Sequence, residues 1–205
     1  MIKILVTGFD AFGGEKINPS ALILDMLKER TKDIDLVTCQ LPTVFTKSAA
    51  VVEEAITTSN PHAVISIGQA GGSVGLRVER VALNLADSGT ADNEGNRPAD
   101  TTISPEGPVA YWSTISVKDV VKAIREAGIP ASVSYSAGTF VCNHVFYTTC
   151  NFVATHRLPI KVGFIHVPYL PEQAVGKLGV ASMSLEHMVT ALQNALEIVA
   201  ADVLG

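Results

Sequence analysis

Cys142 lies in a stretch whose neighbours could make its thiol a nucleophile. The stretch is Ser136-Ala-Gly-Thr-Phe-Val-Cys-Asn-His144, preceded by a β-branched run at 131–135 and followed by apolar residues at helical spacing. This pattern predicts a strand, a turn at Gly138 and a helix that begins near Cys142. The first N–H groups of a helix lack intrahelical partners and carry partial positive charge, so they would stabilise a thiolate and could hold an oxyanion. The alternative is a buried cysteine that packs as a small apolar side chain.

A thiol nucleophile needs a base, and the chain has five histidines. His144 and His156 lie on the helix that Cys142 begins, at spacings that point away from the thiol or lie far from it. His62 precedes a predicted strand at the opposite edge of the sheet, and His187 lies in the last predicted helix. His166 alone is expected at the carboxyl end of a strand beside the Cys142 turn, although a lone histidine is often structural.

Zinc binding is a competing use of cysteine and histidine side chains. Cys142, His144 and Cys150 do not have the spacing of paired zinc ligands, and neither C-x-x-C nor H-E-x-x-H occurs. The sequence therefore predicts no metal site.

Glu79 is an acid in an apolar strand pattern. The segment 76–84 alternates as one strand, and counting by two puts Glu79 on the face of Val81 and Leu83. Arg80 points the other way, so Glu79 needs a partner from elsewhere in the fold, because an unpaired acid on an apolar face is costly. The alternative is a solvated glutamate on an edge strand.

Two glycine-rich loops follow predicted strands, at 8–14 and 68–75. They suggest a phosphate cradle, but neither a Walker pattern nor G-x-G-x-x-G is present, and the first loop has no basic residue. Phe9 and Phe12 in that first loop predict an apolar pocket wall, with packing under the loop as the alternative.

The elements that must position these groups alternate between strand and helix. Strands are predicted at 2–7, 34–41, 63–67, 76–84, 111–115, 131–135 and 160–167. Helices are predicted from Asn18-Pro-Ser20, at 47–57, from a capping box of Ser116 and Asp119 to residue 126, from about Cys142, and at 185–199. Such alternation indicates an α/β sheet covered on both faces, with ligands at the carboxyl ends of its strands. That edge would hold Gly8, Gly68, Cys142 and His166.

Composition narrows the class of protein. The chain has 205 residues, 47% of them hydrophobic, and a net charge of −5, which fits a single folded domain over 1–205. It has no basic cluster for nucleic acid, and its apolar runs are too short to span a membrane. Three cysteines, with Cys39 expected in the core, indicate a reducing compartment and no disulfide framework. The segment 85–109, rich in Asp, Asn, Gly and Pro, is interpreted as a lid or an interface arm.

Four motifs together resemble the type I pyroglutamyl peptidase (pyrrolidone-carboxylate peptidase) family. They are Gly8-Phe-Asp-Ala-Phe-Gly-Gly14 with Asn18-Pro-Ser20, Glu79-Arg-Val-Ala-Leu-Asn84, the Cys142 stretch, and Phe164-Ile-His-Val-Pro-Tyr-Leu-Pro171. The resemblance covers nearly the whole chain in the same order. It implies an open three-layer α/β/α sandwich with a mostly parallel central sheet, in a cytoplasmic, cofactor-free homotetramer.

The resemblance also implies an activity, the removal of an N-terminal pyroglutamyl residue from peptides. It places Glu79, Cys142 and His166 as the catalytic triad, and Phe9, Phe12 and Phe140 around the lactam ring of the substrate. Gln69 matches a position whose backbone meets the lactam. One departure is Arg77, which stands where the resemblance leads us to expect a small hydroxyl residue.

Overall fold

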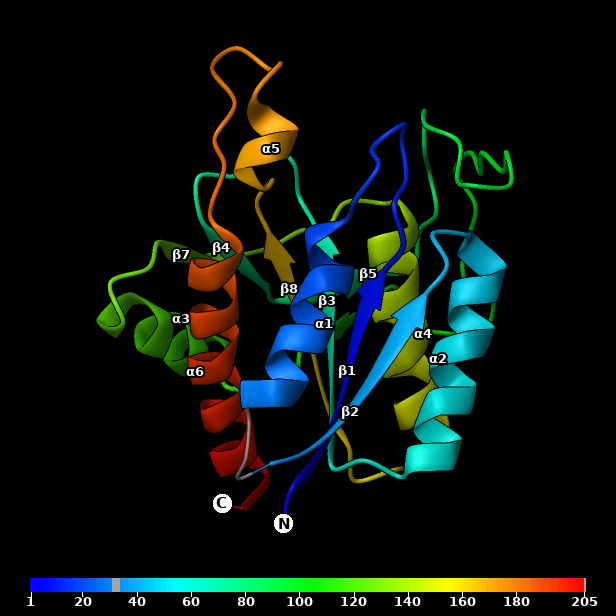
Figure 1. Ribbon diagram of the computed structural model, residues 1–205. Helices are drawn as coiled ribbons and strands as arrows, with labels where there is room; N and C mark the ends of the chain where they lie inside the picture. Colours follow the sequence, from blue (N-terminus) through cyan, green and yellow to red (C-terminus); the bar gives the residue numbers. More distant parts are fainter. Residues whose placement is uncertain (31–33, 205) are drawn as a thin grey trace.

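The computed structural model describes residues 1–30 and 34–204. At its centre is a six-stranded sheet in the order β2-β1-β3-β8-β4-β7 (Figure 1). The strands are β1 (Lys3–Phe9), β2 (Asp35–Leu41), β3 (Ala63–Gln69), β4 (Leu76–Glu79), β7 (Ala131–Ser134) and β8 (Lys161–Val167). The four strands β2, β1, β3 and β8 are parallel, whereas β4 runs antiparallel to β8 and pairs in parallel with β7.

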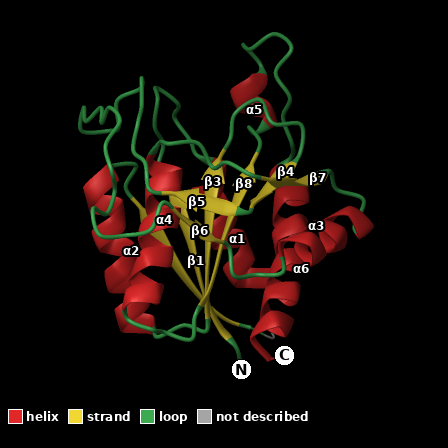
Figure 2. Cartoon of the chain, turned by 180° about the vertical axis from the view of Figure 1, so that it is seen from behind, coloured by secondary structure: helices red, strands yellow, loops and turns green. Residues whose placement is uncertain are grey.

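Helices cover both faces of this sheet, which gives three layers (Figures 1 and 2). One face carries α1 (Pro19–Arg30), α3 (Val117–Glu126) and α6 (Leu185–Leu204), and the other carries α2 (Phe45–Ser59) and α4 (Val141–Thr155). The central strand β1 serves both layers, because Ile4 and Val6 pack on the first face and Leu5 and Phe9 on the second. The predicted α/β/α sandwich with a mostly parallel sheet is confirmed.

Three shorter elements complete the fold. The strands β5 (Val81–Leu83) and β6 (Ala110–Trp112) pair antiparallel as a separate hairpin, and α5 (Pro171–Ala174) follows β8. No helix within residues 1–30 and 34–204 is long and apolar enough to cross a membrane.

The single strand predicted over 76–84 is wrong, because the chain breaks at Arg80 into β4 and β5. The N–H of Arg80 donates to the carbonyl of Ser134 on β7, and its own carbonyl accepts from Ser113 in the residues after β6. Arg80 therefore bonds to two different neighbours, and the residues after it leave the central sheet for the hairpin.

Both predicted helix caps can be checked. Asn18 caps α1 as predicted, since its Oδ1 accepts the N–H of Ser20 at 3.1 Å. The capping box at Ser116 is not formed: its hydroxyl donates instead to Asp202 of α6 at 2.7 Å. Ser116 thus ties the start of α3 to the end of α6.

Candidate active site

Glu79, Cys142 and His166 meet where β4, β8 and α4 come together. Oε1 of Glu79 lies 2.8 Å from Nδ1 of His166, and both side chains are buried, with 0% and 5% of the residue exposed. The Cys142 side chain lies close enough to the same imidazole to interact with it. Because Nδ1 is occupied by Glu79, Nε2 is the ring nitrogen left for the thiol.

Two neighbouring strands bring the acid and the imidazole together. His166 is the penultimate residue of β8, and Glu79 is the last residue of β4. The antiparallel register pairs Arg77 with His166 and Val78 with Ile165, so Glu79 is one step further along β4 on the His166 face. This answers the question of Glu79's partner, which comes from β8.

Cys142 reaches the site by a different route from the one predicted. Because β7 runs against β3 and β8, its carboxyl end does not lie at their carboxyl edge. Residues 135–140 lead the chain to the start of α4, with Gly138 at φ 78°, a conformation that glycine adopts without strain. Cys142 is the second residue of α4, as expected of a helix-start thiol.

The beginning of α4 leaves its amide groups unused. Phe140 is the N-cap residue, and no side chain caps the helix. The first N–H groups of a helix point along its axis without intrahelical partners. An anionic atom at Cys142 would therefore meet backbone donors and the positive end of the helix dipole.

The pKa of His166 is set by opposing effects. Burial lowers it, but the hydrogen bonds from Cys142 and from Glu79 more than offset burial, and the pKa rises to about 9. Oε2 of Glu79 is buried and has no hydrogen-bond partner within the described residues. The carboxylate is thus committed to one neighbour, the imidazole, whose protonated form it stabilises.

Gly68 of β3 packs directly against the thiol of Cys142. A Cβ atom at this position would lie 2.9 Å from Sγ of Cys142 and 2.8 Å from the ring of Phe164. That ring in turn packs against His166, with centroids 4.8 Å apart. The thiol and the imidazole therefore rest on a surface with no room for one more carbon atom.

The predicted aromatic residues separate into two groups. Phe12 and Phe140 are partly exposed and in contact, with ring centroids 5.8 Å apart, whereas Phe9 is 2% exposed and packs on Phe164 in the core. Phe45, which sequence reasoning missed, extends the first group through an edge-on contact with Phe140 at 5.3 Å. The structure thus brings Phe12 and Phe140 together and puts Phe9 behind them in the core.

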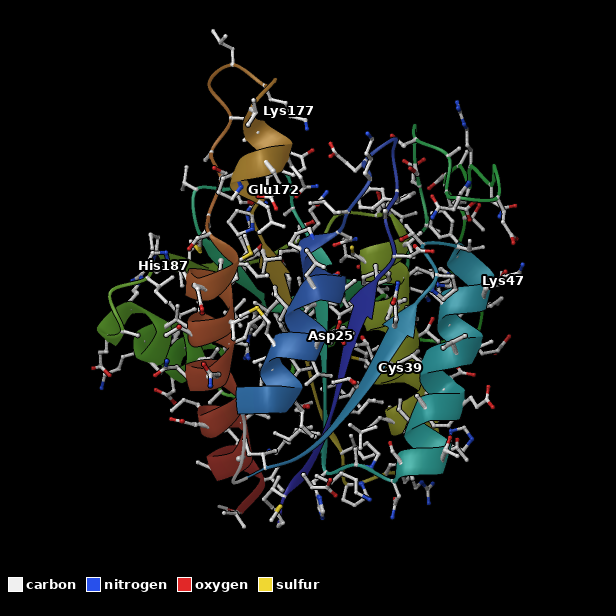
Figure 3. All side chains as sticks on the ribbon, viewed as in Figure 1. Asp25, Cys39, Lys47, Glu172, Lys177 and His187 are labelled. Carbon is white, nitrogen blue, oxygen red and sulfur yellow. The ribbon has the colours of Figure 1, made fainter. Side chains whose placement is uncertain are left out.

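Gln69 belongs to a buried hydrogen-bond network around α5. Its Oε1 accepts from Nε2 of Gln173 at 2.9 Å, and Gln173 also donates to Glu15 and to the carbonyl of Ile17. Lys177 adds an ion pair to Glu15 at 2.7 Å; it lies beside α5 in Figure 3. These bonds hold α5 over the loop that follows β1. Sequence reasoning missed Gln173, whose partners are far from it along the chain.

The remaining histidines and cysteines lie away from the triad. His144 faces Phe45, and burial lowers its pKa to about 4, so it is neutral at pH 7. Burial raises the pKa of Cys150 to about 12. The prediction of Cys39 as a core residue is wrong: it is half-buried on the edge strand β2 (Figure 3), and burial, helped by Glu54, raises its pKa. Within residues 1–30 and 34–204, no cluster of three or more His, Cys, Asp or Glu could hold a metal ion.

The segment 85–109 is anchored by Asp92, which is 6% exposed. Its carboxylate accepts from the N–H of Phe45, the first residue of α2, and from Glu94 and Asn96. Burial raises the pKa of Asp92, but these hydrogen bonds, with that of Asn96 the largest, lower it overall. Asn93 reaches the loop after β1. These bonds attach the segment to the start of α2 and to the loop after β1, and its interpretation as a lid or an interface arm stays a prediction.

Comparison with known proteins agrees with this geometry. The family model for pyroglutamyl peptidase matches residues 2–202. Pyrrolidone-carboxylate peptidase 1 of Caldanaerobacter subterraneus subsp. tengcongensis is 48% identical over 97% of this chain and 98% of that protein. A relative from Bacillus mycoides is also 48% identical, over 97% of this chain and 93% of that protein.

Solved structures lead to the same family. Pyroglutamyl peptidase I of Bacillus amyloliquefaciens superposes with a TM-score of 0.94 at 46% identity, covering 98% of each chain. A mutant pyrrolidone carboxyl peptidase of Pyrococcus furiosus gives a TM-score of 0.95 at 40% identity, over 98% of this chain and all of that one. The family inferred from the four motifs is confirmed, and the chain belongs to the pyroglutamyl peptidases, which are cysteine peptidases.

Proposed function

We propose that this chain is a cysteine peptidase that hydrolyses the bond after an N-terminal pyroglutamyl residue of peptides. The observation that carries the proposal is the buried Glu79–His166 hydrogen bond with the Cys142 thiol beside the same imidazole, at the uncapped start of α4. A thiol in contact with a buried imidazole whose pKa is raised to about 9 is poised to form a thiolate–imidazolium pair. The names of the relatives supply the substrate class.

In the first half of the reaction, the Cys142 thiolate attacks the pyroglutamyl carbonyl carbon and forms a C–S bond. The negative charge moves to the carbonyl oxygen, where the N–H of Cys142 and a neighbouring donor hold it. The C–N bond then breaks, and His166 gives its proton to the leaving amine. Glu79 holds the imidazole in one tautomer and stabilises its charged form.

In the second half, water attacks the thioester and His166 accepts a proton from it. The C–S bond breaks, and free pyroglutamate leaves. Apart from the attacking water, both halves use only side chains and backbone N–H groups of this chain, so we propose a reaction without metal or cofactor.

The lactam ring is neutral and compact, which suits an apolar pocket with a few backbone hydrogen bonds. We assign Phe12 and Phe140 to the walls of that pocket and the Gln69 backbone to the polar contact. Phe9, which packs on Phe164, supports the pocket from behind. Asp92 and Gln173 hold the surrounding segments in place.

A rival function is a phosphorylase or nucleoside-binding protein that uses the glycine-rich loops for phosphate. The loop after β1 argues against it, since this loop presents an acid, Asp10, whose carboxylate accepts from the N–H of Thr43 and from Asn93. A third possibility is a binding module without activity. Release of a chromogenic amine from a pyroglutamyl conjugate, with phosphate-dependent nucleoside cleavage as the control, separates all three.

The essential thiol is tested by substitution. Cys142→Ser should lose nearly all peptidase activity and keep its circular dichroism spectrum, and iodoacetamide should inactivate the wild type while a chelator does not. Full activity in Cys142→Ser, or inactivation by the chelator, would contradict the mechanism.

Three further proposals are a single peptidase domain over 1–205, a cytoplasmic location and a homotetramer. Composition and the family resemblance support the single domain, the cysteine count and the resemblance support the cytoplasmic location, and the resemblance alone supports the homotetramer. Light scattering on the purified protein measures the assembly.

A further inference from the structure

Arg77 presents an unpaired cation next to the catalytic imidazole. It lies on β4, its side chain is exposed, and it is the register partner of His166 across the β4–β8 pair. Alternation along β4 puts Arg77 on the same face as Glu79, whose carboxylate is already bound to His166. Within residues 1–30 and 34–204, no group forms a hydrogen bond or ion pair with the guanidinium of Arg77, whose backbone belongs to the β4 ladders. Its guanidinium is a permanent cation that is free to meet a ligand.

The order of the strands tells on which side of the reaction this cation lies. Phe12 follows β1, and Gln69 ends β3, so the proposed lactam pocket lies on one side of β8. Arg77 is on β4, which borders β8 on the other side. His166, between them, must reach the amine that leaves, so the leaving peptide lies above β8 and points away from the lactam pocket.

This arrangement brings the first leaving residue close to Arg77. Neighbouring strands are about 4.8 Å apart, and one residue of extended chain spans about 3.3–3.6 Å. A carboxylate carried by the first residue after the scissile bond therefore comes within reach of the guanidinium. Arg80, the next arginine, is not available in the same way, because it stacks on Trp112 and bonds to Ser113.

We infer that Arg77 is a specificity-determining residue that favours substrates with a carboxylate on the residue directly after the scissile bond. That carboxylate has two sources: an acidic side chain, or the free carboxyl terminus of a pyroglutamyl dipeptide. The guanidinium fork matches either one. The inference rests on the proposed peptidase function, and it adds the substrate class that this site prefers.

Two matched pairs of substrates distinguish the sources. The first pair is pyroglutamyl-glutamate and pyroglutamyl-glutamine, both amidated at the carboxyl terminus. The second pair is pyroglutamyl-alanine with a free or an amidated carboxyl terminus. Each pair differs only in one charge, so the ratio of kcat/KM within a pair isolates the contribution of the carboxylate.

We expect the wild type to prefer the charged member of at least one pair by about fivefold, the size of an exposed charge pair. Arg77→Ser should bring that ratio close to 1, and Arg77→Glu should invert it. Arg157→Ser removes another exposed arginine, beyond the end of α4 that is far from Cys142, and should keep the wild-type ratio. High salt should weaken the wild-type preference, which tests the idea without any substitution.

The results separate the two proposals. Ratios near 1 in the wild type, or a preference that persists in Arg77→Ser, would overturn the assignment of Arg77 while peptidase activity stands. A wild type that cleaves none of the four substrates, with an intact fold, would overturn the peptidase function and the inference with it.

Discussion

Glu79→Gln offers the sharpest test of how the triad works. The substitution keeps the size of a side chain that is 0% exposed, but it removes the charge that faces Nδ1 of His166 at 2.8 Å. An amide can still accept a hydrogen bond from the imidazole. Any loss of activity then reports on the electrostatic role of the acid and not on a cavity.

The size of the effect follows from the pKa of His166. Burial lowers this pKa, while Cys142 and Glu79 raise it, with a net change from 6.5 to about 9. This difference corresponds to about 3 kcal/mol in favour of imidazolium, and because burial opposes it, Cys142 and Glu79 together contribute more than this. If the carboxylate supplies at least one third of the net difference, Glu79→Gln costs at least about 1 kcal/mol, or about fivefold in the population of thiolate–imidazolium pairs.

Two measurements read out this population. In Glu79→Gln, the rate of Cys142 alkylation by iodoacetamide, followed by mass spectrometry, should fall near neutral pH by the same factor as the population of ion pairs. The increase of this rate with pH should occur at higher pH than in the wild type. The value of kcat should fall by at least as much, with KM within a few-fold, because the lactam pocket is unchanged.

Glu126→Gln, which removes an exposed charge paired with Lys122, is the control. Alkylation curves that overlay, together with an unchanged kcat, would show that Glu79 is an ordinary strand residue and that the triad assignment is wrong.

Three other predictions follow from contacts at the site. Phe12→Ala and Phe140→Ala should raise KM for a pyroglutamyl substrate, whereas Phe9→Ala should mainly lower stability by about 3–5 kcal/mol; Michaelis parameters and urea unfolding measure the two effects, and an unchanged KM in both Phe12→Ala and Phe140→Ala would reject the pocket. Asp92→Ala should cost about 1 kcal/mol of stability at pH 7, and because hydrogen bonds lower the pKa of Asp92 despite burial, this difference from wild type should vanish as the pH falls through that lowered pKa. Asn143 is fully buried and forms three hydrogen bonds to the backbone of residues 83–85, which we expect to align the neighbouring Cys142. Asn143→Leu should therefore lower kcat strongly and change KM little, and kinetic parameters equal to those of the wild type would show that these bonds do not align Cys142.

Local sequence signals single out the three catalytic candidates, and the family resemblance assigns their roles. Cys142 stands at a helix start, His166 near the carboxyl end of a buried strand, and Glu79 is an acid in an apolar pattern. Each feature is a conflict between residue type and expected environment, and such conflicts are visible in one short window of sequence.

Strand direction could not be predicted in the same way. The residues 76–79 and 131–134 do not indicate whether β4 and β7 are parallel or antiparallel to β8, because side chains alternate between the two faces of a sheet in the same way in both cases. Phe9 did carry a usable signal: β1 extends to this residue, and counting by two from Leu5 puts it on the core face. Asp92 and Gln173 could not be found, because their roles depend on partners that the chain brings near only after folding.

The long separations of the site's contacts have a consequence for how the enzyme becomes active. Glu79 and His166 are 87 residues apart, Leu83 and Asn143 are 60 apart, and Gln173 and Glu15 are 158 apart. Closing such loops costs entropy before any contact repays it, and topologies rich in distant contacts fold slowly. During refolding, activity should return no earlier than the last of these loops closes. On the proposed mechanism, a nascent chain that has not yet reached His166 lacks the base for Cys142, so peptidase activity should begin only after residue 166 has been synthesised.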